Sequence, residues 1–78
     1  MIKIYTIANC PSCNAAKRFL RERNQEYVEI DITTAGISRS DLEQLTGGRT
    51  VPQIVIDDNP IGGYDNLLAL DQAGKLPF

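Results

Sequence analysis

The two cysteines of this chain, Cys10 and Cys13, are separated by two residues in the motif Cys10-Pro11-Ser12-Cys13. The apolar, β-branched run at residues 2–7 predicts a strand before the motif, and residues 11 to about 24 predict a helix after it. A Cys-x-x-Cys pair at a strand-to-helix junction indicates thiol–disulfide exchange. Half of a zinc site, a structural disulfide and two unreactive thiols are the alternatives. Structural zinc needs four ligands, and the sequence has no histidine and no second cysteine pair, so we expect no metal.

The position of the motif predicts different roles for the two cysteines. Cys10 falls at the N-cap of the helix and Pro11 at its first position, where a missing N–H is tolerated. The free N–H groups of the first turn and the helix dipole should lower the pKa of the Cys10 thiol and so raise its thiolate fraction. Cys13, one turn inside the helix, should be more buried and keep its proton. We therefore predict that Cys10 attacks the substrate and that Cys13 resolves the mixed disulfide.

Periodicity along the chain predicts the elements that position this motif. The helix at 11–24 has an apolar stripe, formed by Ala15, Ala16, Phe19 and Leu20. Residues 27–32 alternate and predict a second strand, with one apolar face formed by Val28, Ile30 and Ile32. A second helix is predicted from 38 to 45, because Ser38 can cap it, Asp41 can take the capping-box position and Gly47-Gly48 can end it.

The second half of the chain predicts two more strands and a last helix. Residues 53–56 form a continuous apolar run, which is typical of a central strand. Residues 57–59 predict a turn, after which Pro60 can begin an edge strand. The last helix is predicted at 65–73, with four side chains facing inward: Leu67, Leu68, Leu70 and Ala73. The order βαβαββα predicts an α/β fold, with a four-stranded mixed sheet, helices on its faces and a right-handed parallel βαβ unit first.

The size and charge of the chain exclude several classes of protein. Its 78 residues, 42% of them hydrophobic, predict a single domain over 1–78. The net charge of −2 argues against a nucleic-acid partner. This charge is uneven: residues 1–23 carry a net +4 and the remainder a net −6, which we interpret as a solvated surface. With no signal-peptide hydrophobic region and no apolar run long enough for a membrane, we expect a cytoplasmic protein without a membrane partner.

Three motifs in order complete a family resemblance. They are Cys10-Pro11-Ser12-Cys13, then Thr50-Val51-Pro52 ahead of the strand at 53–56, and then Ile61-Gly62-Gly63-Tyr64-Asp65. With these motifs the whole chain resembles a glutaredoxin of the two-cysteine kind. The resemblance implies a thioredoxin-like fold and a monomeric, cytoplasmic oxidoreductase that uses glutathione as its reducing co-substrate. Its substrates would be protein disulfides and glutathionylated proteins, with ribonucleotide reductase as a candidate partner.

The resemblance also implies a glutathione groove, formed by Arg39, Thr50, Val51, Pro52, Gly63, Tyr64 and Asp65. In this groove the backbone of Val51 would pair with the cysteine of glutathione, and Pro52 would be cis. The free N–H groups near Tyr64 and Asp65 would hold the γ-glutamyl carboxylate, and the Asp65 side chain would pair with the ammonium group. Arg39 would face the glycyl carboxylate, with Arg49 as a weaker candidate for that task.

Two departures from the family pattern lie beside the cysteines. Ile7 stands where many relatives have a lysine, and Ser12 stands where the commonest motif has a tyrosine. Both changes should alter reactivity and glutathione affinity. Two other functions stay open: a redoxin recharged by thioredoxin reductase, and an iron–sulfur carrier in which two chains share a cluster through Cys10 and glutathione. The glutathione-site residues argue against the first, and Pro11 argues against the second.

Overall fold

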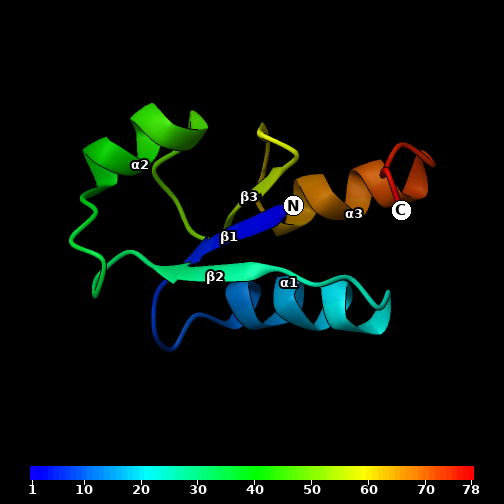
Figure 1. Cartoon of the computed structure of the whole chain (residues 1–78), viewed down its shortest axis with the longest axis horizontal. Helices are drawn as coiled ribbons and strands as arrows, with labels where there is room; N and C mark the ends of the chain where they lie inside the picture. The colour runs from blue at the N-terminus through cyan, green and yellow to red at the C-terminus, as the bar shows by residue number, and fades with distance from the viewer.

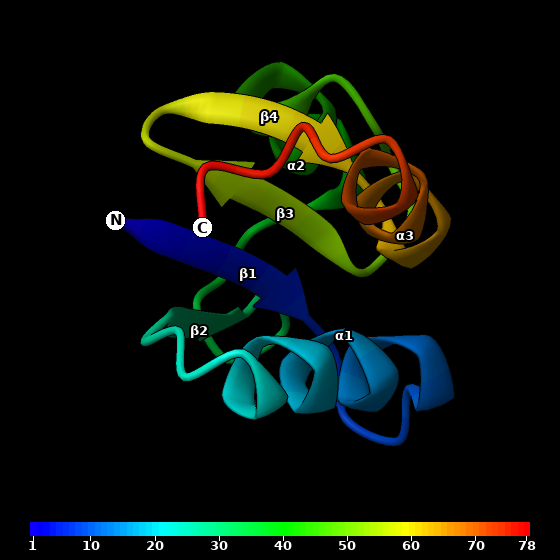
Figure 2. The same ribbon diagram turned by 90° about the vertical axis from the view of Figure 1, so that its right-hand side faces the viewer.

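The structure is a computed structural model that describes residues 1–78. It contains four strands and three helices, in the order β1 (Ile2–Thr6), α1 (Pro11–Glu22), β2 (Val28–Asp31), α2 (Arg39–Thr46), β3 (Gln53–Ile56), β4 (Asn59–Gly62) and α3 (Tyr64–Gln72) (Figure 1). The strands lie side by side in the order β2-β1-β3-β4 (Figure 2). β1 and β2 are parallel, whereas β3 is antiparallel to both β1 and β4. The predicted βαβαββα order and mixed four-stranded sheet are therefore confirmed.

The sheet has helices on both faces, and alternation along the strands decides which side chains meet them. On one face, isoleucines of β1 and β3 pack against α1 and α3, forming a core of Ile2, Ile4, Ala16, Leu20, Ile54, Ile56 and Leu67. On the other face, Tyr5 and Ile32 pack against Leu42 of α2. None of the three helices is long and apolar enough to cross a membrane.

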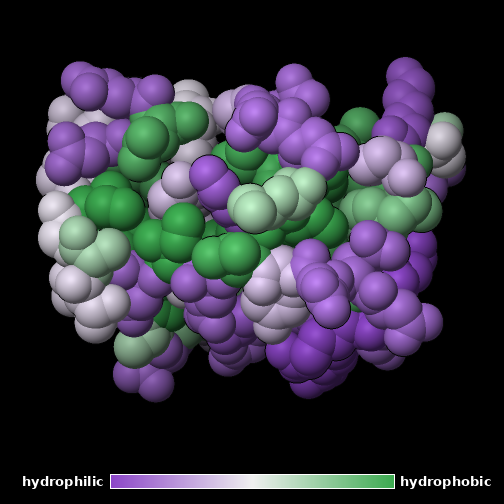
Figure 3. Space-filling view, viewed as in Figure 1, coloured by the Kyte–Doolittle hydropathy of each residue, from purple (hydrophilic) through white to green (hydrophobic).

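The helix α2 covers only part of its face. It lies over the end of the sheet where β1 and β2 finish (Figure 1). Val28 and Ile32 were predicted to share one apolar face of the sheet, yet Val28 is 46% exposed and Ile32 only 3% exposed. The two residues share one face, and the difference arises because Val28 lies outside the cluster that Leu42 covers. A band of hydrophobic surface therefore runs beside α2, over β1 and β2 (Figure 3).

Local signals set the helix ends. Ser38 and Asp41 form the predicted capping box of α2, with N–H to oxygen distances of 3.0 and 3.1 Å. Gly47 ends this helix in a left-handed conformation, with φ +86°. The helix α3 begins one residue earlier than predicted, at Tyr64, because the Asn66 side chain accepts a hydrogen bond from the Gly63 N–H at 3.0 Å. The prediction that Ala73 faces inward is wrong, since α3 ends before this residue and leaves it exposed.

Candidate active site

The two cysteines lie where β1 passes into α1. Cys10 has an extended backbone and is the N-cap of α1, as predicted, and Pro11 is the first helical residue. The Cys13 backbone N–H donates to the Cys10 sulfur over 3.2 Å. The two sulfurs are joined in a disulfide, with 5.2 Å between the Cα atoms. Cys10 is 7% exposed and Cys13 only 1%, so Cys13 is the more buried, as expected.

The neighbours of the disulfide shape its outer side. Pro11 and Ser12 are exposed, and the Ser12 hydroxyl oxygen lies 3.5 Å from the Cys10 sulfur. Ile7, at the position of the family lysine, is half-buried against the apolar cluster of Tyr5, Ile32 and Leu42. This side of the site therefore has a hydroxyl group close to the sulfur and an apolar side chain where the resemblance would place a lysine.

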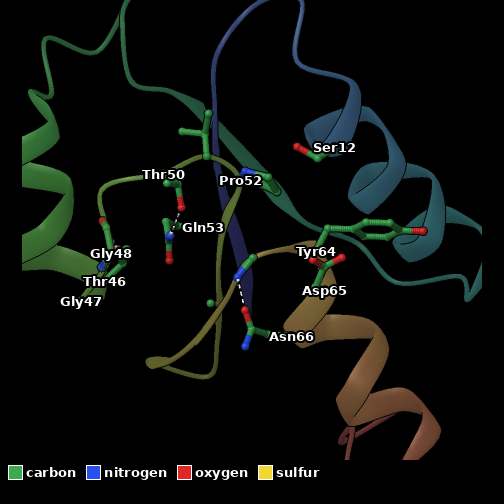
Figure 4. A pocket seen from close by; sticks show the side chains of 13 residues that line it. Ser12, Thr46, Gly47, Gly48, Thr50, Pro52, Gln53, Tyr64, Asp65 and Asn66 are labelled. Atoms are coloured by element: carbon green, nitrogen blue, oxygen red, sulfur yellow. Dashed lines mark hydrogen bonds between the residues drawn. The ribbon is translucent and has the colours of Figure 1, made fainter.

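A groove of about 400 Å³ opens beside the motif and reaches it at Ser12. It brings together six of the seven residues predicted to bind glutathione, namely Thr50, Val51, Pro52, Gly63, Tyr64 and Asp65. The Val51–Pro52 peptide bond is cis, as the resemblance implied. Figure 4 shows Tyr64 and Asp65 at the start of α3, on the same side of the groove as Ser12. Segments that are distant in the sequence thus meet next to the disulfide.

The two arginines proposed for the glycyl carboxylate do not line this groove. Arg39 is exposed and donates from Nη1 to the backbone oxygen of Arg49 over 2.9 Å. Arg49 is exposed as well, and its Nη1 lies 3.2 Å from Glu43 Oε1. Arg49 is therefore paired with a carboxylate, whereas the guanidinium of Arg39 is bonded only to a neutral carbonyl.

Six further residues line the groove although none of them was predicted to bind glutathione, namely Thr46, Gly47, Gly48, Gln53, Gly62 and Asn66. Gln53 is 5% exposed, and its Nε2 donates to the Thr50 hydroxyl over 3.3 Å (Figure 4). A glutamine at the head of a buried apolar strand was a signal that could have been noticed. Asn66 gave no such signal, because its contact with Gly63 depends on the turn between β4 and α3.

The N-terminal end of α3, where the helix dipole is positive, faces the groove. The N–H of Gly63 is bonded to Asn66, but the first-turn N–H groups that follow it have no intrahelical partner. Such a helix start favours an anionic group. Asp65 adds an exposed carboxylate at the same place, where a cation could pair with it. No group of three or more His, Cys, Asp or Glu side chains is placed to hold a metal ion.

A disulfide at the start of a helix, where backbone N–H groups can stabilise the thiolate formed on reduction, is suited to exchange with other disulfides. Together with this sheet order, it defines the chain as a thiol–disulfide oxidoreductase of the thioredoxin-like fold. The family model for glutaredoxin matches residues 2–61, and the chain belongs to the glutaredoxin family.

Individual relatives agree with this family. The chain is 41% identical to a glutaredoxin of Pseudomonas aeruginosa over 75 residues, covering 96% of this chain and 89% of that one. It is 40% identical to glutaredoxin 3 of Escherichia coli, covering 96% and 90%. Among solved structures, a buckwheat glutaredoxin–glutathione complex superposes with a TM-score of 0.87 at 28% identity, covering 96% of this chain and 71% of that one. A glutaredoxin from Brucella melitensis superposes with a TM-score of 0.79 at 38% identity, covering 95% and 80%.

Proposed function

We propose that this chain uses glutathione to reduce protein disulfides and glutathione mixed disulfides. The observation that carries the proposal is the groove, which gathers Thr50, Val51, Pro52, Gly63, Tyr64 and Asp65 beside the motif. A buckwheat glutaredoxin of the same fold has been solved as a complex with glutathione. We also propose that residues 1–78 form one domain that acts as a cytoplasmic monomer, with ribonucleotide reductase as a candidate protein substrate.

In the proposed reaction the Cys10 thiolate attacks a sulfur of the substrate disulfide, and the other substrate sulfur leaves with the electron pair. The Cys13 thiolate then attacks the Cys10 sulfur, which forms the Cys10–Cys13 disulfide and releases the second substrate thiolate. One glutathione thiolate opens this disulfide by bonding to the Cys10 sulfur. A second glutathione attacks the bound glutathionyl sulfur, so that glutathione disulfide leaves and both cysteines are reduced. The N–H of Cys13 is placed to stabilise the Cys10 thiolate.

Different residues of the groove would bind different parts of glutathione. The backbone of Val51, next to the cis bond, would pair with the cysteine of glutathione. The first-turn N–H groups at Tyr64 and Asp65 would hold the γ-glutamyl carboxylate, and the Asp65 carboxylate would pair with the ammonium group. At the other end of the ligand, Ile7 supplies no charge. The exposed guanidinium of Arg39 is then the proposed partner of the glycyl carboxylate.

An NADPH-coupled assay with glutathione and glutathione reductase tests the proposal on two substrates. One is the mixed disulfide of glutathione with a small thiol, and the other is a protein disulfide. Cys10→Ser should abolish turnover of both. Cys13→Ser should keep the first activity and lose the second, because only the protein disulfide needs a resolving thiol. A Cys13→Ser variant that is inactive on the small mixed disulfide would show that the roles are wrongly assigned.

Two controls separate the proposal from the alternatives left open by the sequence. Turnover with thioredoxin reductase alone, without glutathione, would identify a redoxin of the other type. Anaerobic reconstitution with iron and sulfide, followed by absorption spectroscopy and gel filtration, would reveal a coloured dimer if the chain carried an iron–sulfur cluster. We expect activity only with glutathione, and a colourless monomer.

A further inference from the structure

Three side chains meet between the helix of the motif and the sheet. The Glu29 atom Oε2, on β2, accepts from the Lys17 ammonium of α1 over 3.0 Å. The same oxygen accepts from the hydroxyl of Thr6, at the end of β1, over 2.9 Å. The Lys17 side chain is 19% exposed and Thr6 is 1% exposed. None of the three lines the groove, so the network belongs to no part of the site described above.

Lys17 is the residue one helical turn after Cys13. Side chains at positions i and i+4 share a face of the helix, about 5–6 Å apart at their Cβ atoms. Long side chains in a helix lean toward its N-terminus, so Lys17 leans toward the turn that carries Cys13. Cys13 is 1% exposed and the Lys17 side chain 19% exposed, as expected for two positions on the side of α1 that faces the sheet. The hydrogen bond to Glu29 then holds the ammonium group on this side of α1.

Few other charges face Cys13. The side chains of β1 and β3 on this side of the sheet are isoleucines and Thr6, which are uncharged. On the elements that flank the motif, the titratable side chains that share this side of the sheet or border the groove are those of Lys17, Glu29, Asp31, Tyr64 and Asp65. The Asp31 carboxylate accepts from the N–H groups of the turn that follows it, Tyr64 packs against the core, and Asp65 is exposed beside the groove. Lys17 is therefore the one cation among these groups, one helical turn after the resolving cysteine.

We propose that Lys17 is a positioning residue that favours the Cys13 thiolate in the resolving step. Glu29 and Thr6 hold the Lys17 ammonium group in place, and the negative charge of Glu29 limits how far that ammonium group stabilises the thiolate. This inference rests on the proposed roles of Cys10 and Cys13. In that step Cys13 gives its proton to water, the Cys10–Cys13 bond forms and the bond between Cys10 and the substrate sulfur breaks. The electron pair leaves on the substrate sulfur. A nearby cation lowers the cost of the negative sulfur from which the step begins.

The test uses the reduced full chain and the aromatic disulfide 5,5′-dithiobis(2-nitrobenzoate). Attack by Cys10 releases one coloured thiolate, and resolution by Cys13 releases a second one in a phase independent of reagent concentration. Stopped-flow absorbance therefore measures the resolving step directly, at each pH. Lys17→Met should leave about tenfold less Cys13 thiolate near neutral pH, but a more basic thiolate is a better nucleophile. The second phase should therefore slow about threefold near neutral pH. In alkali, where Cys13 is fully ionised, the order should invert, and the variant should be up to about threefold faster because its thiolate is the more nucleophilic.

Glu29→Gln should have the opposite effect. It keeps an oxygen that can accept from Lys17 and Thr6 but removes the negative charge, so the second phase should become faster near neutral pH. The midpoint of its pH profile should move down, whereas Lys17→Met should move it up. Lys17→Arg keeps the charge and should restore the wild-type profile. Arg18→Met removes a neighbouring cation on the exposed side of α1 and serves as the matched control, with no expected change.

The signs of these changes decide the result. If the network only stabilised the fold, Lys17→Met and Glu29→Gln would both change the rate of the second phase in the same direction at every pH. That outcome would overturn the proposal. An unchanged pH midpoint in Lys17→Met would overturn it too. Circular dichroism checks that each variant is folded. Loss of the first phase in the wild type, or its survival in Cys10→Ser, would instead contradict the proposed roles of the cysteines.

Discussion

Replacement of Gly62 by alanine tests how the turn between β4 and α3 builds one wall of the groove. Gly62 has φ +103°, a region that residues with a Cβ rarely adopt. A Cβ placed on this residue would lie 2.6 Å from Oδ1 and 2.8 Å from Cγ of Asn66. That same Oδ1 accepts the hydrogen bond from the Gly63 N–H at the start of α3. Gly62→Ala should therefore strain the backbone and also displace the side chain that caps the helix.

The expected cost is the sum of these two effects. The positive φ contributes about 1–2 kcal/mol for a residue with a Cβ. Loss of the hydrogen bond from the Gly63 N–H to Asn66 contributes about 1 kcal/mol. Gly62→Ala should then lower the free energy of unfolding by about 2–3 kcal/mol, which corresponds to a fall in Tm of roughly 10–20 °C for a chain of this size. Because the start of α3 is also the proposed γ-glutamyl site, KM for the glutathione mixed disulfide should rise, by about fivefold for about 1 kcal/mol of binding.

Urea unfolding and the coupled assay measure both effects, and Gly36→Ala is the matched control. Gly36 also has a positive φ, +70°, but no atom lies within 4 Å of the position of its Cβ. The Gly36→Ala variant should lose only the backbone contribution to the free energy of unfolding, about 1–2 kcal/mol, and its KM should not change. In an Asn66→Ala background the contacts with Oδ1 and Cγ are gone and only the Cβ, at 3.2 Å, remains. Gly62→Ala should then cost less than in the wild type and approach the cost of Gly36→Ala. Fully additive costs in the double variant would refute the proposed contact between the new Cβ and Asn66.

Two other changes have directions that the structure sets. Arg39→Met should raise KM for the glutathione mixed disulfide about two- to fivefold, as expected for the loss of an exposed ion pair. Arg49→Met is the control and should leave KM unchanged, because Arg49 is already paired with Glu43. Equal KM changes in the two variants would contradict the proposed role of Arg39. The hydrogen bond from Lys17 lowers the pKa of Glu29 below its ordinary value of 4.5, although burial opposes it and the hydrogen bond from Thr6 adds to it. The stability that this carboxylate contributes is present above about pH 4.5 and is lost as the pH falls through the lower pKa of the folded state. Urea unfolding should therefore give wild type a higher free energy of unfolding than Glu29→Gln near neutral pH and similar values for both in acid. A difference that persisted at about pH 2 would count against this linkage.

Much of the fold followed from signals that act within one helical turn or along one strand. Pro11 at the first helical position, the Ser38 and Asp41 box and the left-handed Gly47 each satisfy backbone groups only a few residues away. Where such a signal begins or ends a helix depends little on the rest of the chain, and these helix ends were predicted to within about two residues. Ala73, which was wrongly predicted to face inward, lies past the end of α3, where the helical period no longer applies.

The groove was predictable only in part. The family resemblance placed six of its residues by position, and the structure brings all six to the groove. Gln53 and Asn66 were missed because their roles depend on neighbours that the sheet supplies, the loop before β3 in one case and the turn after β4 in the other. The exposure of Val28 could not be predicted either, because it depends on how far α2 extends over its face of the sheet.

The sequence by itself determined the chemistry of this protein and the order of its elements, because a Cys-x-x-Cys pair, a proline at a helix start and an apolar period are all local properties. Only the tertiary structure decided what surrounds the two sulfurs. Lys17, Glu29 and Thr6 lie 11 to 23 residues apart in the sequence, and only the parallel pairing of β1 with β2 under α1 brings them together. Such contacts depend on strand register and helix placement, which no short stretch of sequence specifies.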